Sequence, residues 1–384
     1  MGTGSPWCGG SERFDHRRMA VRSVRFMSAT AYCLLRQRVA QAGLFLLMVL
    51  SAAFAADHAA PQAPPSPPPL LLEGGRRLEF VRAFSAEQEI KTKHPFWNKL
   101  IEVIAGAPNR VRMVRPYDVV TDSRGRIIVS DPGATLVHIF DFEKGKYEKL
   151  VGTAKHPFKS PLGVAVDNGD NIYVADSELG KVLVFDSLGK FRRYIGNLKG
   201  GEGFFKRPTG IAVDAPNNRV YITDTLRDAV YYADLQGNIL GHFGSRGSGP
   251  GEFNFPTELL TRNGELFVVD AMNFRVQFFD GTGQYHGSFG QMGPVTGYLW
   301  RPKGLAMDKE GHFYVADAVL DVVQVFDREG TLLYYFGQQG DRLGEFEFPA
   351  GISIDRNDRV YVVDMVNRRV EVFQYMDKAK AGSN

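Results

Sequence analysis

The chain has 384 residues, of which 44% are hydrophobic, 12% aromatic and 23% charged, a composition that excludes the disordered and fibrous classes of protein. Its net charge of +3 is unevenly distributed, since residues 1–55 contain seven Arg and two acidic residues and the remainder carries −2. Nucleic-acid binding requires a clustered excess of Lys and Arg, so this balance argues against RNA or DNA as a partner.

Residues 1–55 have the pattern of a secretory signal peptide. Arg36 and Arg38 precede the apolar run AGLFLLMVL, which is followed by an A-x-A motif ending at Ala55. This order predicts cleavage after Ala55 and a periplasmic or secreted location in a bacterial envelope. The alternative is an uncleaved inner-membrane anchor, for which the apolar run is short.

The positions of the cysteines indicate that the part of the protein after Ala55 contains none. Cys8 and Cys33 both precede Ala55, so the predicted mature protein has no thiol for a disulfide or a thiolate metal site. Residues 56–75 contain HAAPQAPPSPPP and are predicted to form an extended, Pro-rich linker.

Residues 76–106 contain one strand and one helix. RRLEFVRAFS, at 76–85, resembles GTLLYYFG at 330–337, which reads as an outer strand of a later repeat. PFWNKLIEVIAG, at 95–106, places its large apolar residues on one face and predicts an amphipathic helix. That helix serves either as a structural cover or as a lid or partner contact.

Six copies of one unit occupy the rest of the chain. Their leading prolines follow one another at intervals of 45 to 48 residues, and an aspartate marks a second common place. The prolines are Pro116, Pro161, Pro208, Pro256, Pro302 and Pro349, and the aspartates are Asp131, Asp176, Asp224, Asp270, Asp317 and Asp364. A period in the forties built from short β-runs is the signature of propeller blades.

Each unit reads as four antiparallel strands, a to d. In the second unit these are GVAVD, NIYVAD, KVLVFD and FRRYIG, separated by polar turns. The a–b and c–d turns are short, whereas the b–c loops vary and the d–a loops are long and Gly-rich. The sequence therefore predicts an all-β, six-bladed propeller of four-stranded antiparallel blades, whose functional face carries the b–c and d–a loops.

The repeats resemble the NHL family over about residues 76–375. The shared elements are Pro-x-Gly-hydrophobic-Ala-x-Asp, then YVAD, then VFD, then a Gly-rich bridge to the next Pro. The family's Asn-x-Arg after strand b occurs only at Asn273/Arg275 and Asn367/Arg369. The resemblance implies a six-bladed propeller that acts as a binding scaffold, an amidating lyase or an RNA-binding module.

The sixth unit ends after its strand c, at RVEVFQY (369–375), and a polar tail follows at 376–384. We expect residues 76–85 to supply its missing strand d, so that the last blade is closed by an N-terminal strand and no sheet edge stays open.

Signatures of catalysis are sparse. The chain has no G-x-S-x-G elbow, no H-E-x-x-H motif and no phosphate loop. Amidating lyases similar to NHL proteins hold zinc with channel histidines, and strand a supplies none here. The histidines of the body are interpreted as packing or surface residues.

The six repeat aspartates are interpreted as structural, whereas residues at the channel mouth are candidates for binding. Because Asp131, Asp176, Asp224, Asp270, Asp317 and Asp364 recur in every unit, they are interpreted as structural acceptors of N–H bonds from the following turn. The position two residues after the leading Pro is Gly in four units but Asp118 and Glu258 in the first and fourth. We expect these acids at the channel mouth, and the intervening positions add Tyr117, Thr209, Thr257 and Lys303 as candidate binding residues.

Three hypotheses of function follow. The first is a monomeric, non-enzymatic scaffold that binds a protein, peptide or glycan and has no cofactor. The second is a metal-dependent hydrolase or lyase, lactonase-like or amidating-lyase-like, with calcium at Asp118 and Glu258, although opposing blades should hold these carboxylates too far apart to share one ion. An alternative interpretation of the acids is a solvated polar edge of the mouth, where Lys303 neutralises one of them. If the acids instead bind a ligand or metal, replacing both with Gly should leave folding intact or slightly improved and should weaken that binding. The third hypothesis, RNA binding, is disfavoured by the signal peptide and by the net charge of −2 after residue 55.

Overall fold

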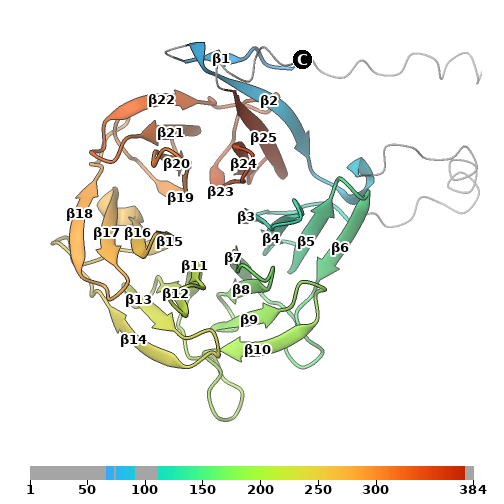
Figure 1. Ribbon diagram of the computed structural model, residues 1–384, viewed down its shortest axis with the longest axis vertical. Helices are drawn as coiled ribbons and strands as arrows, with labels where there is room; N and C mark the ends of the chain where they lie inside the picture. Colours follow the sequence, from blue (N-terminus) through green and yellow to red (C-terminus); the bar gives the residue numbers. More distant parts are fainter. Residues whose placement is uncertain (1–65, 73–74, 91–110, 377–384) are drawn as a thin grey trace, which may run out of the picture. The chain divides into compact units, whose positions relative to one another are not determined.

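A computed structural model describes residues 66–72, 75–90 and 111–376, and in it six β-sheets are arranged in a ring (Figure 1). All described residues belong to one unit of the chain, within residues 65–384. The prediction of an all-β, six-bladed propeller is confirmed.

Five blades are formed by consecutive segments of chain. Blade 1 contains β3 (Asp118–Thr121), β4 (Ile127–Asp131), β5 (Leu136–Asp141) and β6 (Lys146–Leu150). Blade 2 contains β7 (Pro161–Val166), β8 (Ile172–Asp176), β9 (Lys181–Phe185) and β10 (Phe191–Ile195). Blade 3 contains β11 (Pro208–Asp214), β12 (Arg219–Asp224), β13 (Ala229–Ala233) and β14 (Ile239–Phe243). Blade 4 contains β15 (Pro256–Arg262), β16 (Glu265–Asp270), the 3₁₀ turn η3 (Ala271–Asn273), β17 (Arg275–Asp280) and β18 (Tyr285–Phe289). Blade 5 contains β19 (Pro302–Met307), β20 (Phe313–Asp317), β21 (Val322–Phe326) and β22 (Leu332–Phe336).

Blade 6 joins the two ends of the described chain. Its strands β23 (Pro349–Ile354), β24 (Arg359–Asp364) and β25 (Arg369–Met376) are followed by β2 (Arg77–Phe84), which pairs antiparallel with β25. The 3₁₀ turn η2 (Glu87–Glu89) comes after β2. The expected closure by an N-terminal strand is therefore confirmed.

The segment expected to be only a linker contributes a short strand. Within 56–75, β1 (Leu70–Leu71) pairs antiparallel with β2 and makes blade 6 a five-stranded sheet. The physical reason is that β2 would otherwise be an unpaired edge, to which extended, Pro-flanked backbone can add.

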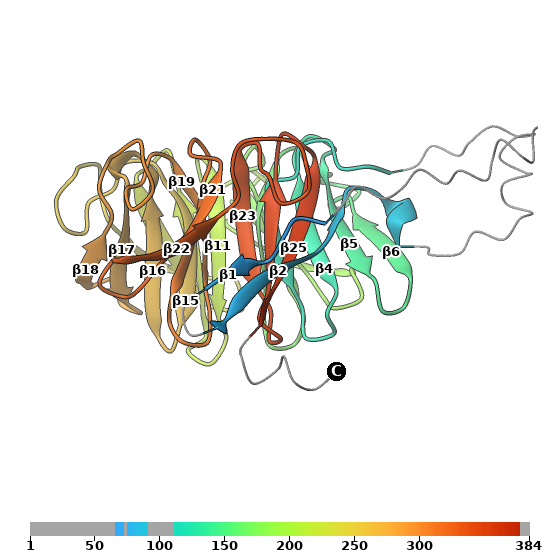
Figure 2. The ribbon, with the colours of Figure 1, turned by 90° about the horizontal axis from the view of Figure 1, so that it is seen from above.

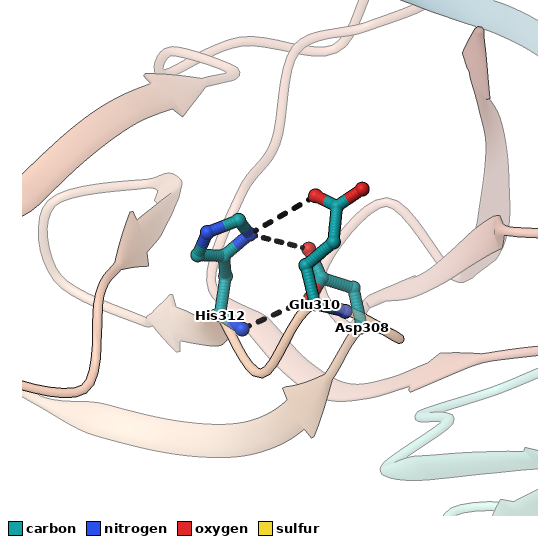
Figure 3. A group of neighbouring side chains, drawn as sticks. All are labelled: Asp308, Glu310 and His312. Atoms are coloured by element: carbon teal, nitrogen blue, oxygen red, sulfur yellow. Dashed lines mark hydrogen bonds and ion pairs between the residues drawn. The ribbon is translucent and has the colours of Figure 1, made fainter. Parts of the chain in front are cut away.

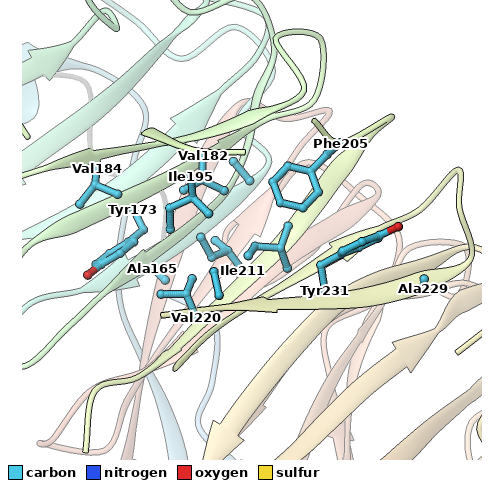
Figure 4. Close-up of a cluster of buried hydrophobic side chains, with 13 residues drawn as sticks. Ala165, Tyr173, Val182, Val184, Ile195, Phe205, Ile211, Val220, Ala229 and Tyr231 are labelled. Carbon is cyan, nitrogen blue, oxygen red and sulfur yellow. The ribbon is translucent and has the colours of Figure 1, made fainter. Parts of the chain in front are cut away.

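Hydrophobic side chains fill the space between neighbouring blades. Figure 4 shows the cluster between blades 2 and 3, where Tyr173 and Val182 face Ile211 and Val220. Five equivalent clusters fill the other junctions. Both faces of each sheet are thereby buried, which explains why strands b and c are mainly apolar.

The strands a, namely β3, β7, β11, β15, β19 and β23, line the centre of the ring (Figure 1). In the side view of Figure 2 the loops form two opposite faces. Pro208 pairs with Asp224 and Asp214 with Arg219, so each strand a begins on the face of the b–c and d–a loops and ends on the face of the tight turns. We call the first the loop-rich face and the second the turn face.

Several predictions fall outside the described residues. These are the signal peptide or anchor at 1–55, most of the linker, the helix at 95–106 and the tail after Met376. Within the described ranges, no helix has the length and apolarity needed to cross a membrane.

Candidate functional site at the channel mouth

The six repeat aspartates fix the backbone that leads into each strand a. All six are fully buried, and each accepts a backbone N–H from the one or two residues that precede the leading Pro of its own blade. Bonds from the following turn, as expected from the sequence, occur at Asp131, Asp176 and Asp317. These bonds agree with a structural role for the six aspartates. Their principal hydrogen-bond donors are the backbone N–H groups just before the leading Pro.

In every blade, the last residue of the backbone that leads into strand a stands immediately before the leading Pro. Together these six residues form a ring, which we call the rim. The rim residues, in blade order, are Arg115, Ser160, Arg207, Phe255, Arg301 and Phe348. The backbone N–H groups of the three arginines are held by repeat aspartates, at 2.9 to 3.0 Å. The rim is thus a fixed constellation on the loop-rich face rather than a mobile loop.

The two rim phenylalanines have strained backbones. Phe255 and Phe348 have φ values of 56° and 61°, in the left-handed region that bulky residues rarely adopt. Their N–H groups are held by Asp228 and Asp321 from the b–c loops of the preceding blades, at 2.9 and 2.7 Å. Both aromatic side chains remain partly exposed, so the buried aspartates hold apolar surface at the rim at a local energetic cost.

Asp118 lies below the rim and connects two blades. Its carboxylate accepts the N–H of Val119 at 2.8 Å and that of Val164, in the next blade, at 2.9 Å. The side chain is 6% exposed, and burial raises the pKa of its carboxyl to about 7. Both oxygens therefore have backbone partners, which leaves Asp118 a structural role that the sequence did not indicate.

Glu258 is the freer of the two acids. It is 8% exposed and accepts the N–H of Leu259 at 2.9 Å. Burial, with a further contribution from the charge of Asp118, raises the pKa of Glu258 well above its ordinary value. The two acids predicted for the channel are thus electrostatically linked, and both favour their protonated forms.

The glycines at the equivalent position have a steric explanation. A Cβ on Gly351 would lie 2.5 Å from Asp118 Oδ1, and one on Gly304 would lie 2.2 Å from the carbonyl oxygen of Ala350. Adjacent strands a approach too closely for a side chain there. Replacing Asp118 with Gly would leave the buried Val164 N–H without its partner, so the structure predicts that Asp118→Gly lowers stability, in contrast to the expectation that the double Gly variant folds unimpaired.

Lys303 and Tyr117 come together at the mouth, as predicted, but not through an ion pair. Lys303 Nζ lies 4.7 Å from the centroid of the Tyr117 ring and 5.1 Å from that of Phe348. Burial and the charges of Arg301, Arg115 and Arg207 lower the pKa of Lys303 to about 8. No ion pair within the described part of the chain joins Lys303 to either acid, so the interpretation that it neutralises one of them is wrong.

The two predicted threonines differ in their surroundings. Thr209 is buried in blade 3, where its hydroxyl bonds those of Thr223 and Thr225 at 2.8 and 2.6 Å. The hydroxyl of Thr257 is buried without a hydrogen-bond partner among the described residues. The Thr257 hydroxyl is therefore unsatisfied, whereas that of Thr209 is used in hydrogen bonds within blade 3.

Buried polar residues on strand c hold the d–a loops in place. Gln277 accepts the N–H of Gly251, and Gln324 accepts that of Gly297. The Asn-x-Arg motif adds a second clamp in blade 4, where Arg275 donates to Asp270 and to the carbonyl oxygens of three loop residues. Arg369 makes the same contacts in blade 6.

The group best spaced for a metal ion lies on the turn face. Asp308, Glu310 and His312 bring their ligand atoms within 4.8 Å of one another (Figure 3). Asp308, however, accepts the N–H groups of Glu310 and His312 and also faces His312 Nδ1 at 2.9 Å. The trio closes the a–b turn of blade 5, as Asp122 and Asp355 do in their own turns.

The remaining described histidines lie in packing or surface environments. His138 is buried between Asp131 and Tyr147, and His156 bonds the Tyr194 hydroxyl at 2.8 Å. His242 stacks on Tyr231, and His286 is exposed near Asp280. None of them lies on a strand a.

Comparison with known proteins agrees with the fold. A family described as 6-bladed beta-propeller matches residues 153–242 and 216–289. The E3 ubiquitin-protein ligase NHLRC1 of Rattus norvegicus is 33% identical over 102 residues, which are 26% of this chain and 24% of the ligase. The chain is a six-bladed β-propeller that is similar to part of this ligase, and the match spans about a quarter of that curated relative.

Solved structures share the architecture at low identity. A gluconolactonase from Xanthomonas campestris has a TM-score of 0.53 and 15% identity, over 81% of this chain and 99% of that one. A virginiamycin B lyase from Staphylococcus aureus has a TM-score of 0.50 and 10% identity, over 68% and 95%. These likenesses establish the propeller fold.

Proposed function

We propose that this protein is a binding scaffold that holds a protein, peptide or glycan partner with its loop-rich face and channel mouth. The observation that carries the proposal is the rim, where Phe255 and Phe348 are kept in left-handed conformations with their rings partly exposed. Strain of this kind persists where the surrounding structure enforces it and clusters at ligand sites. Buried Asp228 and Asp321 supply that enforcement.

The composition of the mouth supports a partner with both apolar and polar groups. Phe348 and Tyr117 present aromatic faces beside Lys303, and aromatic residues supply much of the contact area at binding sites. Similarity to part of an E3 ubiquitin-protein ligase supports a protein partner. The proposed scaffold acts as a monomer and needs no cofactor.

A second candidate function is metal-dependent hydrolysis or lysis at the mouth. Glu258 favours it, because a buried carboxyl that has a raised pKa and a single backbone hydrogen bond, from Leu259, suits general acid–base chemistry. Asp118 does not, since both its oxygens accept backbone N–H groups. Elemental analysis of purified protein for bound calcium or zinc separates this candidate from the scaffold.

We also propose that the protein is exported to the periplasm or secreted, with an inner-membrane anchor as the alternative. The order of basic, apolar and A-x-A segments within residues 1–55 supports export. N-terminal sequencing of the protein from its native host should give Ala56 as the first residue. A full-length species in the membrane fraction would instead support the anchor.

The scaffold proposal is tested with an array of glycans and peptides. We expect the wild-type protein to bind a defined subset and the variant Lys303→Ala/Phe348→Ala to lose most of that binding. The matched control is Lys309→Ala/Leu188→Ala, which removes one exposed Lys and one exposed apolar residue away from the mouth. Absence of any array ligand, or equal losses in both variants, would contradict the proposal.

A further inference from the structure

Three rim arginines lie on alternate blades of the ring. Arg115, Arg207 and Arg301 belong to blades 1, 3 and 5, and each is the residue immediately before the leading Pro. Repeat aspartates hold their backbone N–H groups at equivalent positions. The three side chains therefore start from related points around the channel axis.

These arginines are not neutralised by the protein. All three are exposed, and within the described residues none forms an ion pair. The two positions before each leading Pro hold five basic residues and one acid, Glu347, although the body as a whole is slightly acidic. Of these basic residues, Lys159 alone has an ion-pair partner in the described part of the chain, namely Glu178 at 3.6 Å. The positive charge is thus concentrated at the rim.

The groups below the rim do not cancel this charge. The positive charges of all three arginines contribute to the lowered pKa of Lys303, so their field reaches the mouth. Burial raises the pKa of both Asp118 and Glu258, which favours their uncharged forms and so reduces the negative charge below the rim. Lys303, with a pKa of about 8, stays largely charged near neutral pH.

The opposite end of the ring has a different character. A cavity on the turn face is lined by Asp122, Asp167, Asp170 and Asp355, together with Arg356. Two of these carboxylates are already paired, Asp122 with Arg126 at 2.6 Å and Asp170 with Arg124 at 3.3 Å, so charges on this face are balanced within the protein in a way that those of the rim arginines are not.

We propose that the rim arginines and Lys303 bind an anionic group, a carboxylate or a phosphate, carried by the ligand of the scaffold. Guanidinium groups bind both kinds of oxyanion through paired N–H donors, and an ammonium group adds a point charge. The neighbouring rings of Phe348 and Tyr117 would contact the uncharged part of the same ligand. The inference rests on the proposed binding function and specifies the chemistry of its ligand.

Titration calorimetry with citrate and with pyrophosphate, in low-salt buffer, tests the inference on the whole protein. We expect the wild type to bind at least one of them, and the preferred probe distinguishes carboxylate from phosphate. The variant Arg115→Gln/Arg207→Gln/Arg301→Gln should bind at least about tenfold more weakly, because each charge-assisted contact contributes on that order. The control Arg192→Gln/Arg219→Gln/Arg356→Gln removes the same charge elsewhere and should stay within about twofold of wild type.

Two results would overturn the inference. One is a wild-type protein that binds neither anion, and the other is an equal loss in both triple variants, which would show a response to net charge alone. In either case the scaffold proposal survives if array binding still depends on Lys303 and Phe348. If that dependence is also absent, the binding function itself fails.

Discussion

At the scale of single residues, Asp118 and Glu258 occupy the position that is Gly in the other four repeats, but their contacts differ. Asp118 joins blades 1 and 2 through backbone bonds, whereas Glu258 has one backbone bond and a raised pKa. The sequence placed both acids at the mouth because their repeats differ from the others. It could not assign the two roles, because the contact to Val164 depends on how neighbouring strands approach.

The raised pKa of Glu258 predicts a pH-dependent effect of the variant Glu258→Gln. A carboxyl whose pKa is raised by folding contributes stability below its unfolded pKa, and that contribution is lost as the pH rises toward the folded pKa. Gln keeps the acceptor for Leu259 N–H without a charge. We expect Tm to rise by a few degrees at pH 8 and to be unchanged at pH 4, as measured by calorimetry. Exposed Glu329→Gln is the control, and a uniform change at both pH values would contradict the assignment.

Substitution of Phe348 should affect ligand binding and folding stability to different extents. Gly adopts a φ of 61° freely, so Phe348→Gly should remove about 1 kcal/mol of backbone strain, which offsets the loss of a partly exposed ring. We expect the free energy of unfolding in urea to stay within about 1 kcal/mol of wild type, while array binding falls sharply. Asp321→Ala, which removes the partner of the Phe348 N–H, should instead lower stability. A Phe348→Gly protein that binds normally would place the ligand elsewhere.

At the scale of elements, the period of the repeats was sufficient to predict the blades and their closure. Prolines 45 to 48 residues apart mark each strand a, and the missing strand of blade 6 was found by its likeness to 330–337. The pairing of Leu70–Leu71 was not predictable, because a Pro-rich segment has no strand periodicity. The left-handed Phe255 and Phe348 were also missed, since no local signal marks a bulky residue for that conformation.

Deletion of residues 1–84 should destabilise the ring far more than deletion of residues 1–74. The longer deletion removes β2, which pairs with β25 along its whole length and contributes Phe84 and Leu78 to the core. We expect aggregation or a large fall in Tm for that variant, because the edge of β25 becomes exposed. The shorter deletion removes only β1 and should remain a folded monomer by size-exclusion chromatography. Equal behaviour of the two proteins would contradict closure by β2.

At the scale of the whole molecule, the propeller brings together residues that the linear sequence keeps far apart. Arg115, Arg207 and Arg301 lie more than ninety residues from one another along the chain, so no local motif reveals their convergence. The net charge of −2 for the body concealed a basic rim. The fold and the place of the two mouth acids could be predicted from the sequence. The clustering of basic residues at the rim could not, because it depends on how the closed ring arranges the blades.

The claim that the loop-rich face is the binding face is tested most directly by hydrogen–deuterium exchange. The protein is measured with and without the tightest-binding ligand of the array, and peptides from both faces are compared. We predict slower exchange at the starts of the strands a, around residues 114–118, 300–304 and 347–351, and no change in the turns at 122–126 and 308–312. Protection confined to those turns would contradict the account.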